Sequence, residues 1–299
     1  MLNIIGNRKI FLTFSAVLVI VCVAAVAVFG FRQGIDFKGG TLWNFKVDGG
    51  PAASEMNELL GSALGTSDVH VSVDSDGAFL ARLPDLGEDQ HQKAAAVIQA
   101  QYSGFQELSF QSIGPSVGAS LRNKAIVALI LVLAAISLYI AFAFRKVFQP
   151  VSSWKYGWIT LLTLLHDVAV PAGVMAALGH YLNVEIDTNF LVALLVVMGF
   201  SVHDTIVVFD RIRENLLKER AKGDFEGIVN RSINQTLARS INTSLTLILV
   251  LVALYAIGPA GLHYFVLTLL IGVITGIYSS IFVASPMLIV WQKWSRRGS

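Results

Sequence analysis

Long stretches with almost no charged side chains dominate this chain. They span residues 10–31, 125–144, 156–179, 188–209 and 240–292. A helix rises about 1.5 Å per residue, so each of the first four runs can cross a hydrocarbon core of about 30 Å. The last run has 53 residues and is interrupted by Gly258, Pro259 and Gly261, which divides it into two helices. The pattern therefore predicts six transmembrane helices.

Composition agrees with a membrane protein. Hydrophobic residues make up 55% of the 299 residues and charged residues 14%, whereas soluble domains have about 45–50% apolar and about 25% charged residues. Cys22 is the single cysteine and can form no intrachain disulfide. Asn7, Arg8 and Lys9 would also suit a cleaved signal peptide. The apolar run that follows has 22 residues, longer than the usual apolar region of about 7–15, which favours a retained helix.

Basic residues predict the orientation, because lysine and arginine in short loops stay cytoplasmic. With the N-terminus inside, fifteen of the 22 lysines and arginines are cytoplasmic. The short loops around Asn183 and Gly261 contain none. The remaining seven lie in residues 32–124, where eleven acidic residues give a net charge of −4. Both termini are therefore expected in the cytoplasm. The fifteen include Arg8, Lys9, Arg145, Lys146, Lys155, Lys222, Lys293, Arg296 and Arg297.

Residues 32–124 differ abruptly in composition from the rest and predict a small exported domain. It separates a first part, residues 1–31, from a five-helix part, residues 125–299. Alternating and helical periods predict strands over 35–47, 69–73, 78–83 and 107–113, and helices over 52–64 and 90–102. This β-α-β-β-α-β order is that of a ferredoxin-like α+β fold. Its exposed sheet edge can add a strand from an extended polypeptide.

No catalytic or metal-ligating spacing is found in the exported domain. Its acidic residues are scattered, and His70 and His91 are isolated in sequence. We therefore expect neither an enzyme nor a metal site nor any other cofactor.

Asp204 is the most informative residue of the chain. It lies sixteen residues into the fourth run, where an unpaired carboxylate costs a few kcal/mol or more. Burial favours the neutral acid, and a nearby cation favours the charged one, so a counter-ion that approaches and withdraws makes a proton switch. Arg239, at the start of the fifth run, is the nearest candidate partner. The alternative is a static ion pair that only fixes helix packing.

Two further ionisable sites lie within the predicted membrane. His166 and Asp167 sit near the middle of the third run and form either a second proton relay or a structural hydrogen bond. His203 directly precedes Asp204 and points about 100° away from it around the helix. We therefore expect His203 to contact a neighbouring helix.

Residues 210–239 form a charged cytoplasmic segment with apolar residues at helical intervals after Lys222. This pattern predicts an interfacial amphipathic helix that binds anionic membrane lipids. A connector packed on the helical bundle would show the same pattern. Nucleic acid is a poor partner, because acidic residues alternate with the basic ones.

Several motifs in order along the chain resemble the SecD/SecF family, and SecF within it. The first is GIDFKGGT at 34–41, followed by IGPSVGASLRNKA at 113–125 and LLHDV at 164–168. GFSVHDTIVVFDRIREN at 199–215 and NQTLARSINTS at 234–244 complete the set. The first motif alone would also suit SecD. Together they cover almost the whole chain.

The resemblance implies both a fold and a function. The fold is six helices forming half of an RND-superfamily core, with a ferredoxin-like exported domain after the first helix. The function is that of a SecF-like translocase subunit in the bacterial cytoplasmic membrane. With SecD, it would use the proton motive force to promote late stages of protein export, after the ATP-driven motor has acted. The implied partners are SecD, the SecYEG channel, YidC and accessory subunits, and the translocating preprotein, with protons as the coupling ion.

The resemblance also implies roles for single residues of these motifs. Asp204 matches the intramembrane acid that takes up the proton in the family, and Arg239 matches the arginine that modulates it. His203 departs from the family, since many relatives have asparagine there. The remaining motif residues are Asp210, Arg211, Arg213 and Glu214 at the cytoplasmic end of the fourth helix, and Gly34, Asp36, Gly39 and Gly40 after the first helix.

Together these features suggest a mechanism. Protonation of Asp204 would weaken its pairing with Arg239, shift the helices, and swing the exported domain through a glycine hinge at residues 32–40. Two alternatives are a non-transporting scaffold of the translocon and half of an RND-type exporter of small molecules or lipids. The scaffold predicts that the buried charges are only structural, and the exporter predicts a binding pocket in the exported domain.

Overall fold

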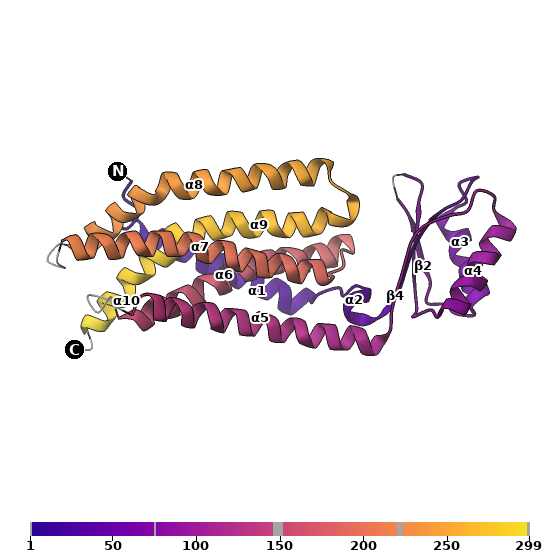
Figure 1. The fold of residues 1–299 in the computed structure, drawn as a ribbon, viewed down its shortest axis with the longest axis horizontal. Coiled ribbons are helices and arrows are strands. Elements are labelled where there is room, and N and C mark those ends of the chain that lie inside the picture. The colour runs from indigo at the N-terminus through magenta and orange to yellow at the C-terminus, as the bar shows by residue number, and fades with distance from the viewer. Residues whose placement is uncertain (1, 75, 146–151, 220–223, 298–299) are drawn as a thin grey trace. The chain divides into compact units, whose positions relative to one another are not determined.

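The computed structural model describes residues 2–74, 76–145, 152–219 and 224–297. It divides into two compact units. The helical bundle comprises residues 1–32 and 127–299, and the sheet domain comprises residues 33–126. Figure 1 shows the two units and the order of their elements. Lys146 and Lys222, two of the basic residues used to predict orientation, lie outside the described residues.

The prediction of six helices that can span a membrane is confirmed for the described residues. The last of them is continuous from His263 to Trp294 but contains a π-helical turn at Ser280–Ala284. Their bounds are α1 (Arg8–Phe29), α5 (Pro115–Ala143), α6 (Ser153–Leu182), α7 (Thr188–Lys218), α8 (Phe225–Ile257), and α9 (His263–Ser279) with α10 (Ser285–Arg297).

The spanning helices form an inner and an outer group. Slightly more than half of the apolar segments of α6 and α9 is buried, and half of that of α7, against 11–17% for α1, α5 and α8. A helix that is apolar on all sides and exposed within the bundle is suited to contact lipid. The inner helices α6, α7 and α9 therefore contribute most of the buried side chains of the bundle. Both chain termini lie at the same end of the bundle (Figure 1).

The sheet domain confirms the predicted ferredoxin-like order. Its four strands are antiparallel in the order β2-β3-β1-β4. Alternate residues Trp43 and Phe45 of β1, with Phe79 of β3, are fully buried under the two helices, as the period of two in the sequence requires. The elements are β1 (Gly40–Lys46), α3 (Ala53–Leu64), β2 (His70–Val73), β3 (Phe79–Leu83), α4 (Glu88–Gln101) and β4 (Gln106–Ile113).

The start of the first predicted strand is wrong. Ile35–Lys38 forms a short helix, α2, and the strand begins only at Gly40. Gly39 and Gly40 have φ angles of +84° and +126°, which separate the helical turn from the strand. A Cβ at Gly39 would lie 2.7 Å from the Cα of Pro115. These glycines permit a sharp reversal and close backbone packing, and we call the contact of Gly39 and Gly40 with Pro115 and Leu83 the packed junction. The hinge expected over residues 32–40 stays a prediction.

The predicted interfacial amphipathic helix over residues 210–239 is also wrong. Its charged first part is the end of α7, and its apolar second part is the start of α8. Ile228, Val229 and Ile233 are buried in the bundle core together with Ile4 and Ile5. The connector packed on the bundle, which predicts the same pattern, is the correct interpretation.

Replacing Gly39 by alanine tests the packed junction. In Gly39→Ala the new Cβ would be strained by the positive φ and would also clash with the backbone of Pro115. In Gly49→Ala the φ is similar, at +88°, but the Cβ would lie in open space. We expect Gly39→Ala to destabilise the sheet domain by about 1–3 kcal/mol more than Gly49→Ala, measured as protease resistance of the full chain against denaturant. Equal resistance of the two variants would contradict the packed junction.

Candidate functional site: a buried acid and serine cluster

Two glycines on α9 bring the inner helices unusually close together. A Cβ at Gly272 would lie 2.2 Å from a methyl carbon of Val197, and one at Gly276 would lie 3.1 Å from the Cβ of Ser201. Glycines spaced four residues apart line one face of a helix and let a neighbouring backbone approach. Here α7 approaches α9, so that Ser201 and Asp204 come to lie beside Ser279 and Ser280.

Asp167 lies at the centre of this contact and is fully buried. Ser279 of α9 donates a hydrogen bond of 2.7 Å to its Oδ2, and Ser201 of α7 donates to the same oxygen. His166 Nδ1 lies 2.8 Å from Asp167 Oδ1. Buried carboxylates need such donors, because an unsatisfied charge in an apolar interior is costly. Three donors from three helices hold Asp167 in place.

Asp204 is nearly as buried, with 4% exposure, but has fewer contacts. Ser280 Oγ donates a hydrogen bond of 2.6 Å to Asp204 Oδ2. Ser280 is the only hydrogen-bonding side chain found for Asp204 within the part of the chain that the structure describes. Asp204 therefore lies inside the bundle, on a helix long and apolar enough to span a membrane, and two buried acids contact neighbouring serines on the sixth span.

Arg239 and His203 lie apart from this cluster. Arg239 is exposed on α8, and among the described residues it forms no ion pair; the predicted contact with Asp204 is not seen in the isolated chain. His203 is exposed while Asp204 is buried, as their positions around α7 require. Physically, α7 turns Asp204 inward and His203 outward, and Arg239 lies on the outer face of α8.

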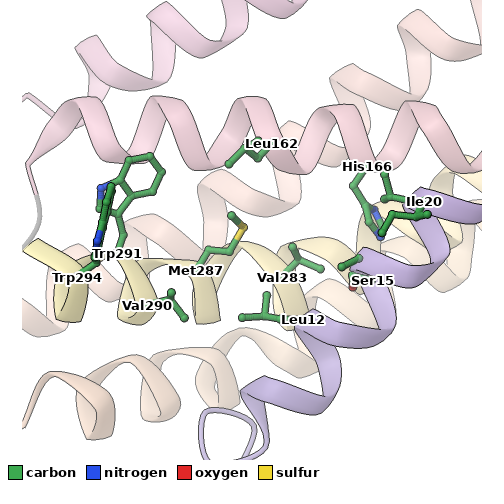
Figure 2. Close-up of a pocket in the computed structure, with 12 residues that line it drawn as sticks. Leu12, Ser15, Ile20, Leu162, His166, Val283, Met287, Val290, Trp291 and Trp294 are labelled. Atoms are coloured by element: carbon green, nitrogen blue, oxygen red, sulfur yellow. The ribbon is translucent and has the colours of Figure 1, made fainter. Parts of the chain in front are cut away.

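An apolar groove of about 570 Å³ lies beside the cluster, between α1, α6 and the end of the sixth span. His166 forms one end of its lining, and Trp291 and Trp294 form the other (Figure 2). The His166 ring is 4% exposed, and its Nε2 has no hydrogen-bond partner among the described residues. His166 therefore connects the polar cluster with an otherwise apolar surface.

The motif residues at the end of α7 form a separate network. Arg213 pairs with Asp210 at 2.8 Å, and Arg211 pairs with Glu214 at 2.5 Å. Arg211 also donates to Gln235 of α8. These contacts join the ends of α7 and α8. They do not reach the buried acids, so we assign them to positioning the two helices.

The remaining predicted residues lie in the sheet domain. Gly34 is buried ahead of α2, Asp36 lies within α2, and Gly39 and Gly40 form the packed junction described above. His91, expected to be isolated, in fact binds Glu107 at 2.7 Å and stacks on Phe110. This contact joins α4 to β4. Within the described residues no group of three metal-ligating side chains comes together.

The chain also matches known proteins over most of its length. The model of the SecD/SecF protein export membrane protein C-terminal region matches residues 93–294, and that of the SecD/SecF GG motif matches residues 24–48. This chain belongs to the SecD/SecF family. Protein translocase subunit SecF of Thermobaculum terrenum is 43% identical over 98% of this chain and 95% of its own length.

Longer members of the family match as well. Protein translocase subunit SecDF of Thermus thermophilus is 33% identical over 93% of this chain, which covers 37% of that protein. The crystal structure of SecDF from Thermus thermophilus, described as a translocon-associated membrane protein, superposes with a TM-score of 0.83 at 31% identity. It matches 98% of this chain and 39% of the crystallised one. The family resemblance read from the motifs is therefore confirmed.

The three serines of this cluster could not be singled out from the sequence. Ser201, Ser279 and Ser280 are common, uncharged residues, and nothing marks them individually within apolar runs. The signal that was available is the pattern of small residues in GVITGIYSS at 272–280. Such spacing indicates a close helix contact in a membrane, and the serines directly follow it.

The glycine contact can be tested by filling it. Gly276→Val would force α9 away from Ser201, and overpacking of this kind costs about 1–3 kcal/mol. We expect a lower thermal unfolding temperature of the full chain in detergent. Gly199→Val is the matched control, because Gly199 lies on α7 with open space at its Cβ position. An equal fall in both variants would argue against a special contact between α7 and α9.

Proposed function

We propose that this chain is a SecF-like subunit of a protein translocase. With a SecD-like partner, it uses the proton motive force to promote late stages of protein export, after an ATP-driven motor has acted. The relatives named protein translocase subunit SecF, matched over nearly their whole length, support the assignment. The proton is the coupling ion, and the role is one of transport, with no chemical catalysis required.

Asp204 carries the proton part of the proposal. It is a buried carboxyl group in a spanning helix, and Ser280 is its only hydrogen-bonding side chain in the described structure. One neutral donor compensates a buried charge poorly, so a change of surroundings can shift the balance between the ionised and the neutral acid. One proton crossing supplies about 2.3 kcal/mol per 100 mV, enough to bias a two-state helix movement.

A polar face on α8 supports a partner within the membrane. Arg239, Asn242, Thr243 and Thr246 are exposed and share one side of the helix. Ile241, Leu245 and Val252 are exposed on another side, each about half accessible. Only the apolar side suits lipid, because polar side chains at membrane depth face protein or water. We infer that the SecD-like partner covers the polar face, where it brings Arg239 into a proton site shared by both subunits.

The orientation follows from charge. The chain is a multi-pass membrane protein with its two termini at one end of the bundle. Since that end carries most of the basic residues, we place it in the cytoplasm of a bacterial cell and the sheet domain outside. The SecYEG channel, YidC and the preprotein are the proposed partners beyond SecD.

One observation favours a second candidate function. Asp167 is held by three donors from three helices, which is the arrangement expected of a structural charge. A translocon scaffold whose buried acids only fix helix packing is therefore the alternative. It differs from the proton-driven subunit in what happens when Asp204 is neutralised.

Neutralising Asp204 separates the two functions. In membrane vesicles carrying the complete translocase, we expect Asp204→Asn to abolish the stimulation of preprotein export by a proton gradient and to leave ATP-driven export intact. Asp187→Asn is the matched control, because it makes the same change on α7 at a helix cap that asparagine also fills. Full proton-dependent stimulation in Asp204→Asn vesicles would support the scaffold.

The two exposed sides of α8 offer a test of the partner. Asn242→Trp and Thr246→Trp would place bulk on the polar face, and we expect each to reduce co-purification of the SecD-like subunit at least tenfold. Ile241→Trp and Leu245→Trp add the same bulk on the apolar face and are expected to leave co-purification unchanged. Equal losses from both faces would contradict the assigned interface.

A further inference from the structure

The sixth span changes its hydrogen-bonding pattern at the acid cluster. α9 ends at Ser279, a π-helical turn covers Ser280–Ala284, and α10 starts at Ser285. π-helical turns are rare and occur frequently at functional sites. This one begins at the residue that binds Asp204, directly after the residue that binds Asp167.

Each of the two serines has a choice of acceptors. Ser280 Oγ lies 2.6 Å from Asp204 Oδ2 and 3.0 Å from the main-chain oxygen of Ile277. Ser279 Oγ lies 2.7 Å from Asp167 Oδ2 and 3.1 Å from the main-chain oxygen of Gly276. A hydroxyl carries one hydrogen. An ionised carboxylate attracts that hydrogen more strongly than an amide oxygen does, and a protonated carboxyl group releases it to the helix.

The backbone at the turn is held by a third serine. Ser285 Oγ donates a hydrogen bond of 3.2 Å to the main-chain oxygen of Ser280. Serine hydroxyls therefore lie within hydrogen-bond distance of main-chain oxygens before the π-helical turn, at Gly276 and Ile277, and at its first residue, Ser280. A hydroxyl bond to a main-chain oxygen of its own helix weakens or bends the local helical pattern. The turn therefore begins at a residue whose hydroxyl lies within hydrogen-bond distance of both a buried acid and the backbone.

We propose that Ser280, assisted by Ser279, is a positioning residue that converts the charge of Asp204 into a change of hydrogen-bond register in the π-helical turn and so moves α10. The proposal rests on the proposed function, in which Asp204 takes up the proton. When Asp204 takes up a proton, the proton stays on its carboxyl group, whose O–H then donates a hydrogen bond to Ser280 Oγ. The hydrogen of the Ser280 hydroxyl turns to the main-chain oxygen of Ile277. No bond between heavy atoms changes.

Among the described residues, Ser280 is the side chain that forms a hydrogen bond with Asp204. Asp204 has no ion pair in the described part of the chain, and His203 points outward from the same helix. The titratable groups near Asp167 are His166 on α6 and Tyr278 on α9, whose ring stacks on that of His166. Neither His166 nor Tyr278 contacts Asp204 through a hydrogen bond.

Ion pairs connect α10 with two other spanning helices and would transmit its movement to them. Lys293 of α10 pairs with Glu226 at the start of α8. Glu226 also pairs with Arg8 of α1 at 3.0 Å. A register change at Ser280 would therefore alter a contact shared by three spanning helices at the end of the bundle that carries the termini.

The first test follows the protonation of Asp204 in the complex with its SecD-like partner in lipid vesicles. The infrared carboxyl band that disappears in Asp204→Asn reports the neutral acid. Ser280→Ala removes the hydrogen bond to the ionised form, so we expect the midpoint of this band to move to higher pH, corresponding to about tenfold tighter proton binding or more. Ser280→Thr keeps the hydroxyl and is expected to restore the original midpoint.

Matched variants separate this effect from general damage to the helix. Thr275→Val on α9 removes a hydroxyl that bonds only to main-chain oxygens, and we expect an unchanged midpoint. Ser280→Cys keeps the size of serine with a weaker donor and is expected to shift the midpoint in the same direction by less. An unchanged midpoint in Ser280→Ala and Ser280→Cys, or an equal shift in Thr275→Val, overturns the proposal.

The second test follows the movement of α10. Spin labels at Val290→Cys and Val17→Cys, both exposed positions, in a Cys22→Ser background give a distance between α10 and α1. We expect this distance to change across the midpoint in the otherwise native chain and in Ser280→Thr, and to stay constant in Ser280→Ala. A distance that still changes in Ser280→Ala overturns the proposal. Should the proposed function itself fail, Asp204→Asn would retain proton-dependent export, which is a different result.

Discussion

The burial of two carboxyl groups inside a helical bundle is the constraint on which the rest of this structure depends. A charge hidden from water must find hydrogen-bond donors nearby. Here the donors are His166 and three serine hydroxyls: Ser201 on α7, and Ser279 and Ser280 on the sixth span. Asp167 receives three donors and Asp204 one, so the two buried acids differ in how firmly hydrogen bonds hold them.

Small residues make that arrangement possible. Gly272 and Gly276 remove the side chains that would keep α7 and α9 apart, and serine is the smallest residue that still supplies a donor. The same span then departs from regular helix just where the donors sit. In the family role proposed here, close packing, polar contacts and a flexible hydrogen-bond register are therefore consequences of one local sequence, GVITGIYSS.

Some expectations failed because one pattern fits two structures. Apolar residues such as Ile228 and Val229, at helical intervals beside charges, suit a helix on a lipid surface as well as one packed on a bundle, and only the neighbouring chain segments distinguish them. The alternation that begins at Ile35 is typical of a strand, yet the residues before Gly39 form a short helix, and the positive φ angles of Gly39 and Gly40 end it before the strand starts. Nearness in sequence also suggests Arg239 as the partner of Asp204. In the isolated chain Arg239 faces outward, because a helical residue faces the side set by its position around the axis.

The sequence by itself determined the six spans, the ferredoxin-like order of the sheet domain and the presence of acids at membrane depth, because hydrophobic periodicity and the cost of buried charge act along the chain. It also carried enough motifs to indicate the family. Only the tertiary structure decided which donors contact Asp167 and Asp204, that Arg239 faces outward, and that a π-helical turn begins where the sixth span contacts Asp204. Those facts depend on contacts between helices far apart in sequence, which local patterns do not encode.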